Sequence, residues 1–222
     1  MARDVKGYEF TFHGNALHAL PNGTLWDGDA RLLCVSDLHL GKSDRIVRRS
    51  GRMIPPYETN ETLSRLAEAI NLMNPAIVVS LGDSFDDLDA VKSLTDANLM
   101  QIAQMQAGRD WVWIEGNHDP GPVSIGGRHL ASLTIGNVTY RHIAENGQKA
   151  EISGHYHPKC TVGRSTKPSF LIDHEKVIMP AFGTYTGGLR GGSAVLRNLM
   201  SPDAIAVLTG RKALPVPFAA VS

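Results

Sequence analysis

Short apolar runs alternate with longer amphipathic segments along the first half of the chain. Residues 31–36, 76–81 and 111–114 are apolar runs of the length that is typical of buried strands. Apolar residues at helical spacing lie between the first two runs: Leu63, Leu66, Ala67, Ile70 and Met73. Residues 86–106 predict a second helical segment that is interrupted near Thr95. Strands that alternate with helices in this way predict a parallel sheet.

The second half of the chain shows mainly strand patterns. Residues 133–135 and 138–142 flank Gly136-Asn137, which predicts a hairpin with a two-residue turn. Further strands are expected at 150–153, 170–172, 177–179, 194–196 and 204–208, and the first 30 residues also alternate like strands. Together the two halves predict a mixed α/β domain in which two packed sheets have helices outside them.

Charge and composition narrow the class of protein. The 222 residues carry 22 Lys and Arg against 22 Asp and Glu, so the formal net charge is zero, which argues against a generic basic nucleic-acid coat. Two cysteines, Cys34 and Cys160, are too few for a disulfide framework. No apolar run approaches the roughly 18 residues of a membrane span, and no secretory signal is visible. We therefore expect a cytoplasmic protein, and its nine histidines point to metal or acid–base chemistry.

Ligand-type side chains follow four of the predicted strands, in the segments VSDLH, LGDSFD, EGNHD and SGHYH. These segments contain Asp37, His39, Asp83, Asp86, Asn117, His118, Asp119, His155 and His157, and His142 ends a further predicted strand. Loops at the carboxyl ends of neighbouring strands converge on one crevice, so these side chains are expected to meet. Carboxylate, imidazole and amide groups suit Mn²⁺, Fe or Zn²⁺, and seven such ligands suit two ions that share a carboxylate.

Each motif taken alone has a simpler explanation. An Asp-x-His pair carries little information, and Gly-Asp or Asn-His-Asp after a strand is common in ordinary turns. The pair His155 and His157 is more specific, but it still does not identify a metal site by itself. The occurrence of all four motifs in this order, each behind a predicted strand, favours the metal site over a set of unrelated turns.

The ordered set D-x-H, G-D-x-x-D, G-N-H-D and G-H-x-H resembles the calcineurin-like metallophosphoesterase superfamily. The motifs span residues 37–157. Flanking phrases at 36–42, 153–159 and 179–189 resemble the bacterial ligase-associated DNA-damage-response endonucleases called PdeM. The resemblance implies an α/β fold: a four-layer α/β/β/α metallophosphoesterase sandwich of two mixed sheets flanked by helices, with residues 1–222 as a single domain.

The same resemblance implies a set of metal ligands. Asp37, His39 and His157 would bind one ion, Asp83 would bridge two ions, and Asn117 and His155 would bind the second ion. A further ligand is expected from a strand between the third and last motifs. There His142, at the end of a predicted strand, is preferred to His129, which lies in a Gly-rich stretch. The expected cofactors are two divalent ions, with Mn²⁺ preferred and Fe or Zn²⁺ as alternatives.

The resemblance also implies a mechanism. His118 would protonate the leaving oxygen, and the Asp86 carboxylate would orient its imidazole. Asp119 would brace the turn. A metal-bridged hydroxide would attack phosphorus, and no covalent enzyme intermediate would form.

A basic stretch follows the first motif and bears on the substrate. It contains Lys42, Arg45, Arg48, Arg49 and Arg52 against the single acid Asp44. Beside a metal crevice such a stretch could bind a phosphodiester backbone, although a solvated loop is the simpler explanation. The resemblance favours binding of the DNA backbone by this stretch, and it implies a DNA substrate in a repair context. It also implies functional association of the protein with an ATP-dependent DNA ligase and repair enzymes.

Two alternative functions remain open at this point. The first is a phosphomonoesterase or a small-molecule (nucleotide) phosphodiesterase of the same superfamily. Both of these enzymes share the motifs with the nucleases that act on DNA. The second is a non-catalytic binding module, and the intact ligand set together with His118 argues against it. The oligomeric state, the strand preference and the physical partners do not follow from the sequence.

Overall fold

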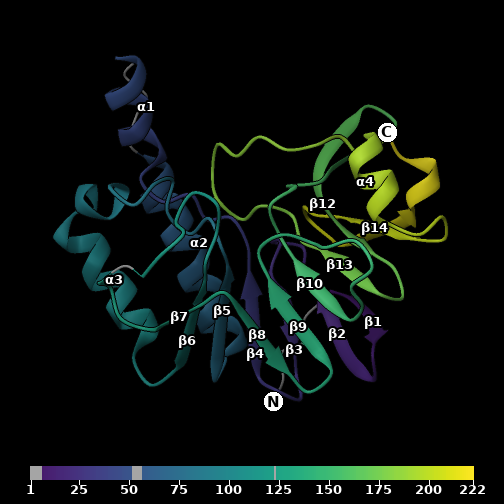
Figure 1. Ribbon diagram of the computed structural model, residues 1–222, viewed down its shortest axis with the longest axis horizontal. Coiled ribbons are helices and arrows are strands. Elements are labelled where there is room, and N and C mark those ends of the chain that lie inside the picture. Colours follow the sequence, from purple (N-terminus) through teal and green to yellow (C-terminus); the bar gives the residue numbers. More distant parts are fainter. Residues whose placement is uncertain (1–6, 52–56, 123) are drawn as a thin grey trace.

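Two β-sheets pack face to face, and helices cover their outer faces (Figure 1). The computed structural model describes residues 7–51, 57–122 and 124–222. Helices α2 (Tyr57–Met73) and α3 (Asp96–Gln106) pack on the outer face of the first sheet, and the short α4 (Ala194–Leu199) packs on the outer face of the second. The expected α/β/β/α sandwich of two mixed sheets is confirmed.

The first sheet is half antiparallel and half parallel. Its strands lie in chain order: β1 (Tyr8–Phe12), β2 (Asn15–Ala19), β3 (Leu25–Asp27), β4 (Leu32–Val35), β5 (Ile77–Leu81), β6 (Asp110–Ile114) and β7 (Arg128–Leu130). Strands β1 to β4 pair antiparallel, whereas β4 to β7 pair parallel. The parallel half is therefore the part in which strand ends, and the loops after them, meet at one edge.

The second sheet is also mixed. Its order is β15 (Leu214–Pro217), β14 (Ile205–Leu208), β12 (Ser165–Ile172), β13 (Lys176–Ile178), β10 (Glu151–Ser153), β9 (Val138–Arg141) and β8 (Ser132–Ile135). Strand β10 runs parallel to both of its neighbours. Strand β11 (Lys159–Val162) pairs only with β12 and forms a hairpin with it.

Alternation along the strands builds separate apolar layers. In β4, Leu32 and Cys34 face the second sheet, while Leu33 and Val35 face helices α2 and α3. Trp111 and Trp113 share the helix-facing side of β6 and are both buried, as their spacing predicts. This burial on both faces explains why the central strands are continuous apolar runs in the sequence.

Two segments differ from the sequence-based expectations. Residues 194–196, expected as a strand, begin α4, because the Ser193 side chain accepts from the backbone N–H of Leu196 and caps a helix there. The basic stretch forms helix α1 (Lys42–Ser50), which ends at Gly51 with φ 66°. The break near Thr95 is confirmed, since Thr95 caps α3.

A short 3₁₀ helix η1 (Ala90–Ser93) precedes α3, and η2 (Phe218–Ala220) lies near the carboxyl end of the chain. Within the described ranges, no helix combines the length and the apolar character that crossing a membrane requires.

Candidate metal centre

All of the motif loops lie along one edge of the two sheets, the upper edge in Figure 1. The first three motifs follow β4, β5 and β6, His142 follows β9 directly, and the last motif follows β10. Backbone hydrogen bonds join the loops: the N–H of His39 donates to Asp83 O and the N–H of Gly154 donates to His142 O, both at 2.9 Å. Residues that are far apart in the sequence are thereby held in one frame.

An unusual backbone conformation is shared by most of the candidate ligands. Their φ angles are positive, at 53°, 47°, 46°, 68° and 46° respectively, for Asp37, His39, Asp83, His155 and His157. Residues other than glycine enter this left-handed region rarely, and each such residue costs about 1–3 kcal/mol. Strain of this kind persists where the surrounding structure requires it, and it is concentrated at functional sites. Here it turns side chains from several loops toward one centre.

The first cluster of potential ligand atoms contains Asp37, His39 and His157. One ligand atom from each lies within 4.8 Å of the others. The Nε2 atom of His157 is 3.0 Å from Oδ1 of Asp37. Asp37 and His39 are buried, and His157 is partly buried. The structure therefore brings together the three side chains that were expected at the first ion.

The second cluster contains Asp83, His142 and His155, again within 4.8 Å of one another. The Nε2 atom of His142 lies 3.4 Å from Oδ2 of Asp83 and 3.0 Å from Oδ1 of Asn117. The Nδ1 atom of His155 lies 3.2 Å from the same His142 nitrogen. His129, the less favoured candidate, lies in β7 and stacks on Trp113 outside both clusters.

Asp83 lies between the two clusters. Its Oδ2 atom is 4.0 Å from Nε2 of His39 and 3.4 Å from Nε2 of His142. The same oxygen is 4.0 Å from Nε2 of His118, so a third overlapping group contains His39, Asp83 and His118. One carboxylate that faces ligands of both clusters is the arrangement that a bridging role requires.

The residues present fit divalent metal ions. The buried Nε2 atom of His39 has no hydrogen-bond partner within the described ranges. Leaving a buried polar atom unpaired costs about 1–3 kcal/mol. An unprotonated imidazole nitrogen in this setting can donate its lone pair to a metal ion. The donors are carboxylate, imidazole and amide, which suit Mn²⁺, Fe or Zn²⁺. Both cysteines are buried elsewhere in the core.

The electrostatics keep the central carboxylates charged. Burial opposes the ionisation of Asp83, but His142 and His118 outweigh it and lower its pKa to about 2. Burial likewise opposes the ionisation of Asp37, and its contact with His157 still lowers the pKa below its usual value. Negative charge is therefore available at neutral pH in both clusters.

Asp119 braces two of the loops. Its carboxylate accepts from the backbone N–H groups of Asp83 at 2.9 Å, Ser84 at 2.8 Å, Phe85 at 3.1 Å and Gly116 at 3.0 Å. Burial raises the pKa of Asp119 to about 6, although these donors favour the charged form. The loop that carries Asp83 is thus tied to the loop that carries Asn117.

The contacts of Asp86 differ from the sequence-based expectation. Its Oδ1 atom is 2.9 Å from Nδ1 of His39, and its Oδ2 atom is 2.8 Å from Nη1 of Arg45. His118 instead places Nδ1 2.8 Å from the backbone oxygen of Asp86. The carboxylate therefore orients His39, and the peptide carbonyl orients His118. Since a carbonyl only accepts, Nδ1 of His118 carries a proton and Nε2 is left facing the clusters.

Comparison with known proteins identifies the family. The family model for calcineurin-like phosphoesterases matches residues 30–179, which include every candidate metal ligand. The chain belongs to the calcineurin-like phosphoesterase family. Membership of this family supports the assignment of the chain as a metal-dependent hydrolase. No curated protein matches the chain.

A solved structure extends the comparison beyond the family domain. The crystal structure of Pseudomonas putida nuclease MPE is similar, with a TM-score of 0.75 and 25% sequence identity. The match covers 95% of this chain and 100% of that chain. The similarity therefore includes the region after residue 179, to which β14, β15 and α4 belong.

Arg45 lies inside this calcineurin-like site, although the sequence suggested an outer substrate contact. Besides the Asp86 carboxylate, its Nη1 atom is 3.3 Å from Asp86 O and 3.2 Å from Nδ1 of His118. Its Nε atom is buried without a partner within the described ranges. No local signal could have placed Arg45 here, because Asp86 is 41 positions away in the chain.

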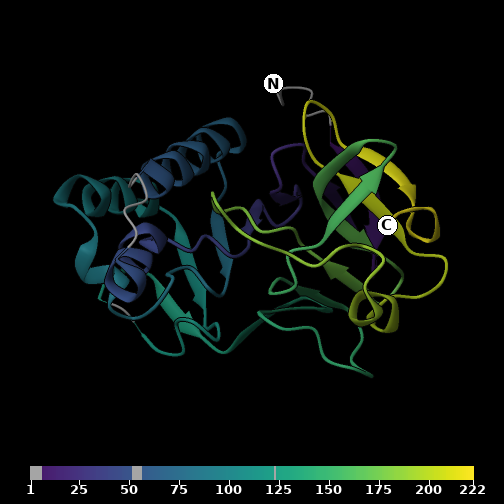
Figure 2. The same cartoon turned by 90° about the horizontal axis from the view of Figure 1, so that it is seen from above.

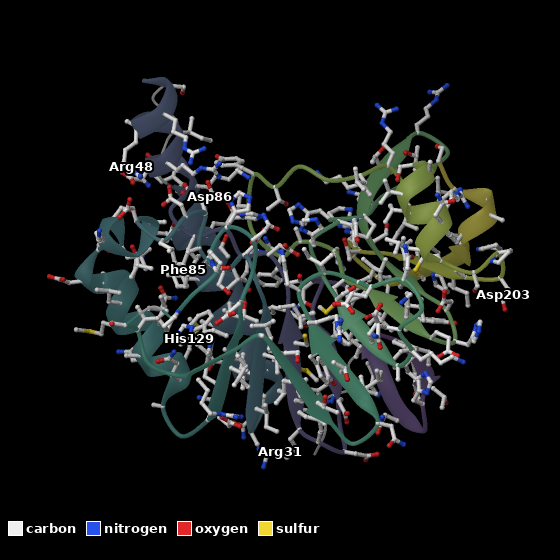
Figure 3. All side chains as sticks on the ribbon, in the orientation of Figure 1. Arg31, Arg48, Phe85, Asp86, His129 and Asp203 are labelled. Carbon is white, nitrogen blue, oxygen red and sulfur yellow. The ribbon has the colours of Figure 1, made fainter. Side chains whose placement is uncertain are left out.

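The other basic residues of α1 lie farther out. Lys42 is partly buried, and its charge contributes to the lowered pKa of Asp86. Arg48, in the last turn of α1 (labelled in Figure 3), pairs with Asp44 at 2.7 Å and with Asp87 at 3.0 Å. Arg49 is exposed, and Arg52 lies outside the described residues. The basic stretch is therefore divided between the site and the surface.

Two cavities flank the metal centre of this phosphoesterase. One, of about 450 Å³, is lined by His142 of the second cluster together with Asn117, Pro120 and Ile143. The other, also about 450 Å³, is lined by His155, His157, Leu189 and Val195. Both cavities border the second cluster, since His142 lines the first and His155 lines the second.

Proposed function

We propose that the chain is a dinuclear-metal phosphodiesterase or nuclease that hydrolyses phosphodiester bonds in DNA. The observation that carries this proposal is the position of Asp83, whose carboxylate faces ligands of both clusters. Asp37, His39, Asp83 and His157 would hold one ion, and Asp83, Asn117, His142 and His155 would hold the other. Mn²⁺ is the metal we expect, with Fe or Zn²⁺ as alternatives.

When bound, two such ions would neutralise charge on the phosphate and lower the pKa of a water molecule. The chain's own residues supply the rest. Nε2 of His118 faces the centre and, when the ring is in its doubly protonated imidazolium form, would deliver its proton to the leaving oxygen. The backbone oxygen of Asp86 fixes the tautomer and direction of this ring. Arg45 places positive charge beside Nδ1 of this ring.

The two cavities favour a diester over a monoester. A phosphodiester carries two groups on phosphorus, and the site offers two separate spaces, one beside Asn117 and His142 and one beside His155 and His157. A monoester would use only one of these spaces. A phosphomonoesterase or a nucleotide phosphodiesterase remains the alternative, because the metal centre could serve all three substrates.

DNA is the proposed substrate for two reasons. A nuclease is among the similar solved structures, and the motifs resemble the ligase-associated endonucleases. We propose on the same grounds that the whole chain forms one catalytic domain. We place it in the cytoplasm, in a repair context with an ATP-dependent DNA ligase and repair enzymes.

A substrate panel with Mn²⁺ tests the proposal. Single-stranded DNA, duplex DNA, a small diester and a monoester would be compared with wild-type protein and with Asp83→Ala. We expect DNA and the small diester to be cleaved faster than the monoester, and Asp83→Ala to abolish all turnover. Preference for the monoester would select the alternative, and a metal-loaded protein that cleaves no ester would favour a binding module.

A further inference from the structure

The β11–β12 hairpin leaves the metal centre directly. Strand β11 begins two residues after His157, and the hairpin rises from the edge that carries the motif loops (Figure 1). Viewed from above, helix α1 and this hairpin lie at opposite sides of the molecule, and the segment around residue 185 extends between them (Figure 2). Two projections therefore flank the centre, of which the sequence singled out only α1.

The hairpin carries positive charge with no acid in the surrounding sequence. Residues 152–172 contain Lys159, Arg164 and Lys167 but no Asp or Glu. Arg164 and Lys167 are exposed, and neither forms an ion pair with any part of the chain that the structure describes. Figure 3 shows nitrogen-ended side chains rising at the free end of this hairpin. These cations are available to an external anion.

Helix α1 differs from the hairpin in this respect. Its cations face an acidic segment, because Asp86 binds Arg45 and Asp87 binds Arg48. Asp44 pairs with Arg48 from within the helix. Two of the four cations of α1, Arg45 and Arg48, are thus already paired with carboxylates of the protein, and a phosphate backbone would have to compete with these carboxylates for them.

The hairpin is also firmly built. Four residue pairs join its strands, from Lys159 opposite Pro168 to Val162 opposite Ser165. Thr161 and Thr166 are hydrogen-bonded across it at 2.9 Å, and Nζ of Lys159 donates to Thr186 O at 2.9 Å. The Cys160 side chain is fully buried at its base. A preformed projection loses little freedom when it binds a ligand.

Its length matches an extended nucleic acid. Arg164 lies seven residues beyond His157, and a strand rises about 3.3 Å per residue, so the tip is up to roughly 23 Å from the centre. Phosphates of one duplex strand are spaced about 3.4 Å along the axis, so this reach corresponds to roughly seven base pairs.

We propose that the β11–β12 hairpin is the main backbone-binding arm for DNA, with Lys167, opposite Cys160, contacting phosphates nearer the bond that is cleaved and Arg164, at the tip, contacting phosphates up to roughly seven base pairs from it. Arg164 and Lys167 would each neutralise one phosphate. This inference rests on the proposed DNA substrate. The stronger DNA-binding element would then be the hairpin, which lies opposite α1, the segment that the sequence suggested for this role.

Binding measured without turnover tests this arm. Arg164→Gln with Lys167→Gln would be compared with the matched control Arg128→Gln with Lys149→Gln. The control pair lies at the amino-terminal ends of β7 and β10, the edge away from the motif loops. Fluorescence anisotropy with labelled DNA of about 30 nucleotides, single-stranded and duplex, would be recorded in EDTA over a range of salt.

We expect the hairpin variant to raise the Kd for the longer DNA about tenfold. The slope of log affinity against log salt should fall by about two, one for each lost phosphate contact. Oligonucleotides too short to reach from the centre to Arg164 should show a smaller rise in Kd than the longer DNA, since they can contact Lys167 but not the tip. The control should keep the wild-type Kd and slope.

The outcomes separate the two proposals. If wild-type protein binds and cleaves DNA and the hairpin variant matches the control, the arm is disproved and the DNA substrate stands. If wild-type protein cleaves a small diester with Mn²⁺ but neither binds nor cleaves DNA, the proposed function itself fails. Tighter binding of wild-type protein to polyglutamate than to DNA would overturn the arm in favour of an acidic protein partner.

Discussion

Nδ1 of His39 lies 2.9 Å from Oδ1 of Asp86, and both side chains are buried. Because an ionised carboxylate only accepts hydrogen bonds, Nδ1 carries the proton and Nε2 presents its lone pair to the first cluster. Asp86→Asn removes this constraint and also the charge that holds Arg45. We expect Mn²⁺ affinity to fall about 10–100-fold, as outer contacts of metal-binding histidines commonly contribute. Titration calorimetry on the metal-free protein measures the change.

Asp87→Asn provides the matched control for that experiment. Asp87 is the next residue in the chain, but its carboxylate pairs with Arg48 at the surface and touches none of the candidate ligands. Mn²⁺ affinity should stay at the wild-type value. If both variants bound Mn²⁺ like wild-type protein, Asp86 would have no role in orienting His39.

The arrangement of the motif loops could be predicted from local sequence because it depends only on where the strands end and on their running parallel. Apolar runs locate β4, β5 and β6, and parallel strands bring the residues after them to one edge. The residues Asp37, Asp83 and Asn117 therefore lie at the same edge of the sheet whatever the details of the loops. The hairpin of β8 and β9 was equally readable, because its turn residues are Gly136 and Asn137.

The partners of individual side chains could not be predicted in the same way. Asp86 meets His39 through its carboxylate and His118 through its carbonyl, and only the rotamers and the loop path decide which group meets which. Arg45 enters the site because α1 is helical, and a nine-residue polar helix has little apolar pattern to reveal it. The same weakness hid α4, whose six residues are too few to separate helix from strand.

A glycine beside Asp83 offers a second test of the centre. A Cβ atom on Gly116 would lie 2.2 Å from the backbone nitrogen of Asp83 and 2.3 Å from its Oδ1 atom. Gly116→Ala must therefore displace Asp83, which faces both clusters. We expect the variant to bind fewer than two metal ions per chain after dialysis, as measured by elemental analysis, with turnover of a small diester reduced at least 100-fold.

Gly121→Ala is the control for this substitution, because a Cβ atom there meets nothing within 4 Å. It lies five positions along the same loop and should leave metal content and turnover unchanged. Unfolding followed by circular dichroism would show whether Gly116→Ala has simply failed to fold. A folded Gly116→Ala protein that keeps two ions and full activity would contradict the bridging position of Asp83.

Single substitutions in α1 should distinguish cations that are paired with carboxylates of the protein from cations that are free to bind DNA. Arg48 is bound to Asp44 and Asp87, whereas Arg49 is exposed with no ion pair to any residue the structure describes. Arg49→Gln should therefore lower the salt slope of DNA binding by about one, and Arg48→Gln should change it much less. Anisotropy over a salt series makes the comparison. Equal slopes for the two variants would show that the ion pairs of Arg48 open when DNA binds.

The role of His118 can be tested through the leaving group. As a general acid, its Nε2 atom matters most when the departing oxygen is a poor leaving group, such as the alkoxide of DNA. His118→Ala should slow DNA cleavage about 10²–10⁴-fold, yet slow cleavage of a nitrophenyl diester far less, because nitrophenolate needs no proton. Metal content should stay at two ions per chain. Since His118 also lies in a group with His39 and Asp83, loss of an ion in this variant would instead identify it as a ligand.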